Sequence, residues 1–301
     1  MTKTKKIWMD GEFVDWDKAN IHVINHSLHY GSAVFEGIRA YPSSAKSTKG
    51  KPAVFRLNEH VERFFFSAKT MGMKLPYTRE EISNAITELI KVNKLDGCYI
   101  RPIAFYGDKM GLSPIDAPVH VAIAVWTWGA YLSKEKVSII ISKYIRIHPQ
   151  SSVMDAKISG HYINSILTSL ESHKAKADEA LLLDFDGNIA EGPGENIFFI
   201  KGKVLYTPQT GTILPGITRD TIFELAKDLG YKIVEKKIQP KDIPSFEEAF
   251  FCGTAAEVCS IEKIDNYTFK TVSKSKEIQK SYMDIVHDEN ARYKKYLTFV
   301  D

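Results

Sequence analysis

One lysine and one pair of carboxylates have the residue types and surroundings that catalysis would use in this 301-residue sequence. Lys157 stands among small and apolar residues, directly before a predicted helix. Burial would lower the pKa of its amine and make it nucleophilic. Most lysines are solvated surface charges, however, so the local sequence alone favours a surface lysine over a catalytic one. Glu191 and Glu195 flank the glycines of 191–196, where the backbone could approach a ligand closely. Composition alone favours a plain turn between strands there.

Two loops have features of ligand-binding turns. Residues 214–220 comprise a glycine-containing loop and the start of the predicted helix 218–229. The N-terminus of a helix presents backbone N–H groups and positive potential, which suits a phosphate, while Thr218 could equally be a simple helix cap. Residues 253–257 form a second turn of small residues, after an apolar strand, that could lie against a ligand. Each loop is a weak signal when taken alone.

Motifs that are absent from the sequence exclude several classes of function. There is no Walker A motif, no GxGxxG after a strand and no GxSxG, so the P-loop, Rossmann and α/β-hydrolase classes lose their main support. His26, His29 and His60 form no metal-binding spacing with a nearby acid, so they are predicted to be structural and no metal site is predicted. The 40 basic and 37 acidic residues leave a net charge of +3 that is spread along the chain, which indicates neither a nucleic-acid nor a membrane partner.

The cysteines and the apolar runs predict a soluble protein of the cytoplasm. Cys98, Cys252 and Cys259 form neither a CxxC motif nor a zinc-binding spacing, and their odd number does not suggest a disulfide framework. No signal peptide is recognised at the N-terminus. The longest apolar run, 121–126, is far shorter than the roughly 20 residues that a membrane-spanning helix needs.

The elements that would position these residues are strands joined by tight turns, with helices between them. Asp10–Gly11 between two apolar runs predicts a hairpin at the start of the chain. Helices are predicted from Asn58, a possible N-cap, and from Thr78, where Thr78 and Glu81 match a capping box. The further strands predicted in this half are 37–41, 53–57, 99–106 and 119–126.

The pattern starts again after residue 135, which predicts a second domain. Strands are expected at 137–141 and 180–184, and helices at 161–176 and 218–229. Short hairpin connections forbid a wholly parallel sheet, so we predict the α+β class, with two α/β-type domains and mixed or antiparallel sheets. The predicted organisation is a small N-terminal domain, an interdomain loop and a large C-terminal domain, at 1–127, 128–135 and 136–301.

Eight segments in consistent order resemble the bacterial type of branched-chain amino acid aminotransferase, in the class IV family of pyridoxal-phosphate enzymes. Each segment is a weak signal, but eight in one order are specific, and the resemblance runs from about residue 7 to about residue 260. It implies the type IV fold of these enzymes, with pyridoxal 5'-phosphate (PLP) in the interdomain cleft. The segments are 28–39, 54–57, 99–102, 128–131, 156–162, 191–196, 214–219 and 253–257.

The resemblance assigns roles toward the cofactor. It implies that Lys157 binds the cofactor covalently and then moves a proton between the substrate α-carbon and the cofactor. Glu191 would face the pyridine nitrogen and keep it protonated, and Tyr162 would hydrogen-bond the ring oxygen. The remaining implied contacts, chiefly with the phosphate, come from Arg56, Gly194, Ile217, Thr218 and Thr254.

The resemblance also implies where the substrates bind. Tyr99 and the turn amides of Thr254 and Ala255 would meet the α-carboxylate. Arg101, at the pocket edge, would bind the side-chain carboxylate of glutamate, and an internal salt bridge is the alternative for this arginine. The other pocket residues that the resemblance implies are Tyr30, Phe35, Gly37 and Tyr131.

These assignments predict transamination between L-leucine, L-isoleucine or L-valine and 2-oxoglutarate, which gives branched 2-oxo acids and L-glutamate. D-amino acid aminotransferase and 4-amino-4-deoxychorismate lyase share the fold and remain alternatives, as does a binding module without chemistry. The resemblance implies a homodimer or a homohexamer. The sequence lacks the CxxC redox switch of the animal members and leaves the role of the loop 108–118 open.

Overall fold

The computed structural model describes residues 2–129, 132 and 134–301, and their contacts divide the chain into two compact units. Unit 1 contains the residues up to Gly129 together with Ala156–Gly160 and Asp284–Asp301, and unit 2 contains the other described residues up to Met283. The predicted domain limits, 1–127 and 136–301, remain predictions. Ala156–Gly160 and Asp284–Asp301 belong to unit 1 because the former bonds to the strand Val34–Phe35 and the latter adds a strand to the same sheet.

Unit 1 has an eight-stranded sheet in which every pairing is antiparallel. The strand order is β16-β5-β4-β6-β7-β1-β2, and β3 pairs with β6 outside this path. The predicted hairpin at Asp10–Gly11 is confirmed: both residues have positive φ, 48° and 95°, as a tight turn between paired strands requires. The strands are β1 (Lys6–Met9), β2 (Glu12–Asp15), β3 (Val34–Phe35), β4 (Ile38–Pro42), β5 (Pro52–Phe55), β6 (Cys98–Tyr106), β7 (Val119–Trp126) and β16 (Leu297–Phe299).

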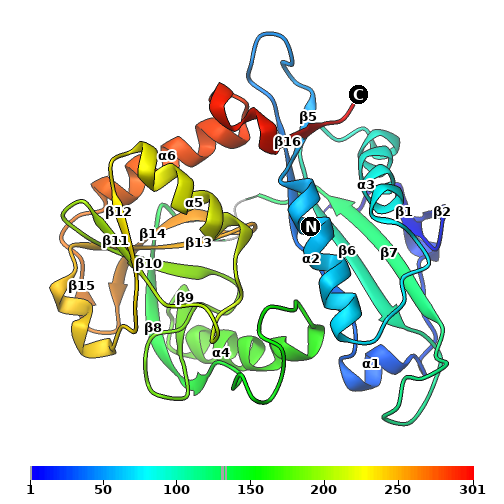
Figure 1. The fold of residues 1–301 in the computed structure, drawn as a ribbon, viewed down its shortest axis with the longest axis horizontal. Coiled ribbons are helices and arrows are strands. Elements are labelled where there is room, and N and C mark those ends of the chain that lie inside the picture. The colour runs from blue at the N-terminus through cyan, green and yellow to red at the C-terminus, as the bar shows by residue number, and fades with distance from the viewer. Residues whose placement is uncertain (1, 130–131, 133) are drawn as a thin grey trace. The chain divides into compact units, whose positions relative to one another are not determined.

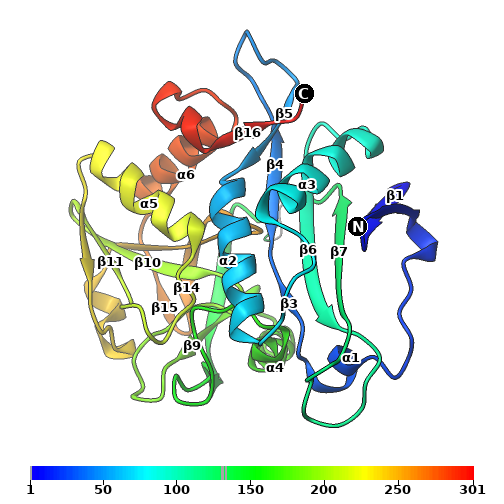
Figure 2. The same ribbon diagram turned by 45° about the vertical axis from the view of Figure 1, so that its right-hand side comes forward.

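Two helices, α2 (Leu57–Thr70) and α3 (Arg79–Asn93), cover one face of this sheet (Figures 1 and 2). The predicted capping box of α3 is confirmed, since Thr78 and Glu81 bond each other's backbone N–H groups. The predicted N-cap of α2 is wrong: the N-cap is Arg56 and not Asn58, because the backbone turns left-handed at Arg56, with φ 52°, and the helix begins directly after it. A shorter helix, α1 (His26–Tyr30), ends at Gly31.

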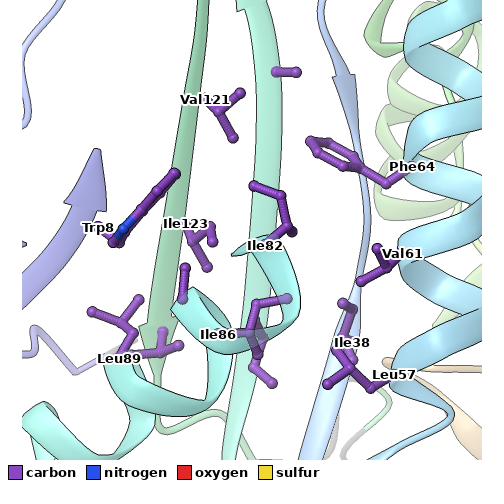
Figure 3. Packing of buried hydrophobic residues seen from close by; sticks show 14 of the residues in the cluster. Trp8, Ile38, Leu57, Val61, Phe64, Ile82, Ile86, Leu89, Val121 and Ile123 are labelled. Carbon is purple, nitrogen blue, oxygen red and sulfur yellow. The ribbon is translucent and has the colours of Figure 1, made fainter. Parts of the chain in front are cut away.

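The core of unit 1 lies between the helices and the sheet (Figure 3). Val61 and Phe64 from α2 and Ile82 and Ile86 from α3 point into one cluster with Ile123 of β7. Phe64, Ile82, Ile86 and Ile123 are fully buried. Each such side chain contributes about 1.5–3 kcal/mol by its removal from water, so this cluster holds α2 firmly against the strands.

Unit 2 has an eight-stranded mixed sheet of order β12-β11-β10-β13-β14-β8-β9, with β15 paired to β14. The pairs β11–β12, β14–β8 and β8–β9 are parallel and the others are antiparallel. The strands are β8 (Lys136–Ile145), β9 (Glu179–Leu183), β10 (Asn196–Lys201), β11 (Val204–Thr207), β12 (Lys232–Glu235), β13 (Glu248–Gly253), β14 (Glu257–Ile264) and β15 (Tyr267–Thr268).

Helices cover both faces of the unit 2 sheet. In both ribbon views α4 (Tyr162–Lys174) and α5 (Ile217–Asp228) lie on opposite sides of it (Figures 1 and 2). The helix α6 (Ser273–Val286) follows β15, and the short helix η4 (Ala291–Tyr296) leads into β16. Antiparallel and mixed sheets with interspersed helices confirm the predicted α+β class. None of the helices in the described ranges is long and apolar enough to cross a membrane.

Candidate active site

Lys157 is fixed in unit 1 through its main chain. Its carbonyl oxygen accepts a hydrogen bond from the N–H of Phe35 at 3.1 Å, and its own N–H donates to Oγ of Ser67 at 2.9 Å. Ser67 lies on α2 and is fully buried. The Nζ atom of Lys157 lies 5.1 Å from the centroid of the Phe35 ring. The lysine is therefore held between β3 and α2, with its amine beside an aromatic side chain.

A buried charge cluster supports the same region. The carboxylate of Glu36 accepts hydrogen bonds from Nε of Arg63 at 2.6 Å and from Nδ1 of His60 at 2.8 Å. Burial alone would raise the pKa of Glu36, but the charge of Arg63 and the His60 hydrogen bond hold it well below its usual range. Burial lowers the pKa of His60, the Glu36 carboxylate opposes this change, and the charges of Arg63 and Lys157 add to it, so the pKa stays below its ordinary value. His60, Arg63 and Ser67 thus lie on one face of α2, which contacts Glu36 and the main chain of Lys157.

Arg101 has an unusual environment for an arginine inside a fold. Its Nη2 donates to the hydroxyl of Tyr99 at 3.0 Å, and its guanidinium carbon lies 4.6 Å from the centroid of the Phe35 ring. The Nε atom is buried and has no hydrogen-bond partner within the described part of the chain. No ion pair of Arg101 occurs among these residues either, so nothing here favours the internal salt bridge. A buried N–H without an acceptor costs about 1–3 kcal/mol, which an anionic ligand would offset.

Gly37 lies beside Tyr99 and has no room for a side chain. A Cβ atom at this position would overlap the Tyr99 hydroxyl, because β4 and β6 pair closely here. The structure thus brings together four of the predicted pocket residues, Phe35, Gly37, Tyr99 and Arg101. Tyr30 is placed at the end of α1, where its hydroxyl accepts a hydrogen bond from Gly111 of the 108–118 loop. Tyr131, also predicted, lies outside the described residues.

Glu191 is the centre of the site residues in unit 2. Its carboxylate accepts hydrogen bonds from Nε of Arg146 at 2.5 Å, from Nδ2 of Asn196 at 3.0 Å and from the N–H of Leu214 at 3.2 Å. Glu191 is 5% exposed and Arg146 is 8% exposed. Hydrogen-bond donors and a cation surround the group, so the carboxylate is held as an oriented anion. The plain-turn interpretation of 191–196 does not account for this burial and bonding.

The loop that leads into α5 meets the same carboxylate through the N–H of Leu214. Gly216 is the N-cap and has no side chain with which to accept hydrogen bonds from the first turn. A Cβ at Gly216 would overlap Oδ1 of Asn196, so the loop and the 191–196 segment are in close contact. Thr218 is buried in the first turn. The alternative that Thr218 caps the helix is wrong, because α5 begins one residue earlier, at Ile217.

The third predicted loop of unit 2 also packs against 191–196. A Cβ at Gly253 would lie 3.3 Å from the carbonyl oxygen of Gly194. Thr254 and Ala255 form the turn between β13 and β14 and are half-buried. Tyr162 is the first residue of α4. The structure therefore brings the motifs at 191–196, 214–220 and 253–257 together within unit 2.

Sequence reasoning missed several residues of these two clusters. Arg146 ends up beside Glu191 although the two are 45 positions apart, and no local pattern around Arg146 points to a role. Ser67 and Glu36 likewise gain their significance only from tertiary contacts. For Asn196, the sequence did offer a signal of a role in the site, because the residue stands within the predicted segment 191–196. No cluster of three or more metal-ligating side chains occurs in the described residues.

This fold and these clusters define a class of enzyme. Residues 33–264 match the model of the family Amino-transferase class IV, and the chain belongs to this family. The branched-chain-amino-acid aminotransferase of Pseudomonas aeruginosa is 43% identical over 98% of this chain and 97% of its own length. The enzyme of that name from Escherichia coli is 40% identical over 87% of this chain and 86% of its own. These similarities confirm the resemblance found in the sequence.

Solved structures agree with the sequence comparison. A branched-chain aminotransferase from Thermoproteus uzoniensis, determined with norvaline, has a TM-score of 0.94 and 38% identity and covers 99% of this chain and 100% of its own. A second branched-chain amino acid aminotransferase, complexed with N-(5'-phosphopyridoxyl)-L-glutamate, also has a TM-score of 0.94 and 38% identity, with 100% of both chains covered. The predicted type of fold is thereby confirmed.

The donor sets of the two clusters fit PLP. The cofactor has an aldehyde that needs an amine, a phosphate that needs cations and N–H groups, and a ring nitrogen that needs an anionic acceptor. In unit 1, Lys157 supplies the amine and Arg56 a cation. In unit 2, Glu191 supplies the anionic acceptor and the first turn of α5 supplies N–H groups.

Proposed function

We propose that this chain transfers amino groups between L-leucine, L-isoleucine or L-valine and 2-oxoglutarate, with PLP as its cofactor. The observation that carries the proposal is the similarity, over nearly the full length, to proteins named branched-chain-amino-acid aminotransferase. The donor sets around Lys157 and Glu191 support it. When bound, PLP supplies a carbonyl carbon that accepts the amino group and a ring that withdraws electrons from the substrate α-carbon.

The chain's own residues orient and move protons in this proposal. Lys157 Nζ would bind the cofactor covalently, and once freed by the substrate it would take the proton from the α-carbon and deliver it to the cofactor carbon that accepts the amino group. Its main chain is bonded to Phe35 and to Ser67, so the backbone from which the amine extends is fixed. Glu191, locked by Arg146, would accept a hydrogen bond from the protonated ring nitrogen. Tyr162 would donate to the ring oxygen.

The phosphate would be bound by charge and by backbone N–H groups. Arg56 contributes a cation at the start of α2, and Ile217 and Thr218 contribute N–H groups of the first turn of α5. Thr218 and Thr254 would add hydroxyl donors, with Gly194 close to the Thr254 turn. This set neutralises a phosphate without a broad basic surface, in agreement with a net charge of only +3.

Two kinds of substrate side chain would share one pocket. Phe35 and Gly37 would form an apolar wall for leucine, and Arg101 would bind the distal carboxylate of glutamate with its unpartnered Nε and its Nη groups. The Tyr99 hydroxyl, which accepts a hydrogen bond from Arg101, would meet the α-carboxylate of both substrates. The amides of Thr254 and Ala255 would bind the α-carboxylate. Tyr30 and Tyr131 complete the proposed wall.

The test is a series of half-reactions followed by the absorbance of the bound cofactor. L-leucine and L-glutamate should each convert the cofactor to its amine form, L-phenylalanine should react more slowly, and D-alanine should not react. Activity confined to D-alanine or to aminodeoxychorismate would contradict the proposal and identify one of the two alternative enzymes. A chain that binds PLP and reacts with none of these compounds would be a binding module.

Reduction with borohydride tests the role of Lys157 in the same preparation. The treatment should attach the cofactor to the peptide that contains Lys157, and the Lys157→Arg variant should remain unlabelled. A label on another peptide would show that the assignment of the catalytic lysine is wrong.

We also propose that the chain acts as a homodimer or a homohexamer in the cytoplasm. A row of apolar side chains on α4 supports self-association: Ile163, Ile166 and Leu170 are 59%, 55% and 57% exposed. They are spaced by three and four residues and so share one helix face. Apolar rows of this kind on a helix usually mark a protein interface. The three buried free thiols suit a reducing compartment.

A further inference from the structure

The C-terminal segment that runs from η4 into β16 contacts Arg56, the proposed phosphate ligand. The N–H of Arg56 donates to the carbonyl oxygen of Tyr296 at 2.7 Å, and Leu297 of β16 pairs with Phe55 of β5 next to it. The guanidinium carbon of Arg56 lies 4.4 Å from the centroid of the Tyr296 ring. The C-terminal segment thus contacts both the backbone and the charged group of this arginine.

The backbone of Arg56 needs such support. Its φ of 52° lies in the left-handed region, which a non-glycine residue adopts at a cost in free energy and keeps only where its surroundings impose it. This conformation turns the chain from β5 into α2. The hydrogen bond to Tyr296 is formed at the very residue where the turn occurs, so the C-terminal segment stabilises the turn.

The side chain of Arg56 is oriented from two directions. Its Nε donates to Oε1 of Glu59 at 2.7 Å, and the Tyr296 ring lies against the guanidinium. A planar guanidinium stacked on an aromatic ring loses freedom to rotate, and a bond at Nε fixes the remaining in-plane orientation. Arg56 is 7% exposed, so it is held in place before any ligand binds.

The C-terminal segment is itself anchored within unit 1. Tyr293, 1% exposed, buries η4, and the N–H of Val300 donates to the carbonyl oxygen of Pro52 at 2.9 Å. Lys51 and Asp301 form an ion pair at 3.0 Å. These residues, 291–301, lie beyond the range 33–264 that matches the family model.

We propose that Tyr296 is a positioning residue for Arg56, and that the helix η4, which ends at Tyr296, therefore takes part in recognition of the cofactor's phosphate. The inference rests on the proposed role of Arg56 toward PLP. Tyr296 acts in two ways: its carbonyl oxygen fixes the left-handed turn, and its ring fixes the plane of the guanidinium. Removal of the ring should weaken binding of a phosphorylated cofactor and leave binding of its unphosphorylated form unchanged.

The experiment compares the Kd of the full-length apo chain for PLP with its Kd for pyridoxal, which lacks the phosphate. The Kd for pyridoxal divided by the Kd for PLP isolates the contribution of the phosphate site. Tyr296→Leu should reduce this ratio by about tenfold, since coupling between contacting residues is of that order. Tyr296→Phe keeps the ring and should keep the ratio within about twofold. Tyr296→Met serves as a second variant without a ring if the leucine variant does not fold.

The matched control is Phe299→Leu, in the strand β16 that follows Tyr296. Phe299 pairs with Ala53 and its ring lies near Lys294, so its loss should loosen β16 without a change in the ratio. Arg56→Gln should reduce the ratio at least as far as Tyr296→Leu, and the double variant should lose no more than Arg56→Gln alone.

Each result separates this inference from the proposed function. A ratio that falls in Arg56→Gln but not in Tyr296→Leu overturns the positioning role and leaves PLP binding by Arg56 intact. A ratio that falls equally in Tyr296→Leu and Phe299→Leu overturns it too, because a general loss of strand packing would then explain the effect. A ratio unchanged in Arg56→Gln removes the phosphate role of Arg56 and the inference with it, while the half-reactions with L-leucine still test the transaminase proposal.

Discussion

The orientation of single residues in these clusters depends on partners that are far away in the sequence. Lys157 and Glu191 were candidates from their motifs, but what orients them is Ser67 in one case and Arg146 in the other. No spacing rule connects such partners, because they meet only after strands and helices have packed. A sequence can therefore predict which residue types take part in catalysis more readily than the groups that hold them. Arg101 shows the same limit, since only the structure reveals that its buried Nε has no hydrogen-bond partner among the described residues.

Gly37 and Tyr99 give a residue-scale prediction about the pocket. A Cβ in Gly37→Ala would overlap the Tyr99 hydroxyl and displace the phenol that bonds Arg101. We expect KM for 2-oxoglutarate to rise about tenfold or more, since a charged hydrogen bond of about 1.5–3 kcal/mol is disturbed. In the Tyr99→Phe background the same glycine substitution should cost clearly less, because the overlapping oxygen is gone. Steady-state kinetics of the four variants in the cycle measure this, and strictly additive effects would contradict the close contact.

At the scale of elements, local signals worked where the structure is local. Asp10–Gly11 and the Thr78 capping box involve residues within a few positions of one another, and both were predicted correctly. The start of α2 was predicted wrongly because it depends on a hydrogen bond between Arg56 and Tyr296, 240 positions later. The same helix carries His60, Arg63 and Ser67 toward Glu36 and Lys157, so its exact start decides where these side chains lie.

The buried face of α2 should make stability depend on pH. The pKa of His60 is below its ordinary value of 6.5, so the neutral ring stabilises the fold above that pH, and this contribution is lost as the pH falls toward the depressed value. The pKa of Glu36 is also lowered, so its contribution is present above its ordinary value of 4.5 and lost at lower pH. We therefore expect the free energy of unfolding to fall from pH 7.5 to pH 5, chiefly through His60 in this window.

Urea titrations at several pH values measure this slope. The His60→Gln variant removes the titrating ring and keeps an N–H that can donate to Glu36, so its stability should change less over the same window. His29→Gln, at an exposed histidine, is the control and should behave like the unmodified chain. Parallel curves for His60→Gln and the unmodified chain would show that His60 does not titrate on unfolding as argued.

For the whole molecule, the sequence predicted the class of fold and the family but not the contribution of the C-terminus to unit 1. Alternation of short strands, tight turns and helices indicates α+β packing from local pattern, and the ordered motifs indicate the family. Strand β16 pairs with β5 at the edge of the unit 1 sheet. The two strands are far apart in the sequence, and no sequence motif predicts a pairing over such a distance. Assembly is decided at this scale too, by surfaces that no internal contact of the chain occupies.

The apolar row on α4 provides the prediction at this scale. Ile163, Ile166 and Leu170 lie on one helix face and are each more than half exposed, whereas the buried residues of α4 are Thr168 and Ser172. Exposure of three large aliphatic side chains in a row costs free energy that a second copy of the chain would recover, at about 1.5–3 kcal/mol for each one buried. Sedimentation should give at least twice the 34.0 kDa mass of one chain.

The double variant Ile166→Glu with Leu170→Glu should sediment at a lower mass with its fold retained, because two carboxylates would have to be buried in the interface. Val92→Glu, at a single exposed apolar residue of α3, is the control and should leave the mass unchanged. An unaltered mass in the double variant would place the interface on another surface of the chain.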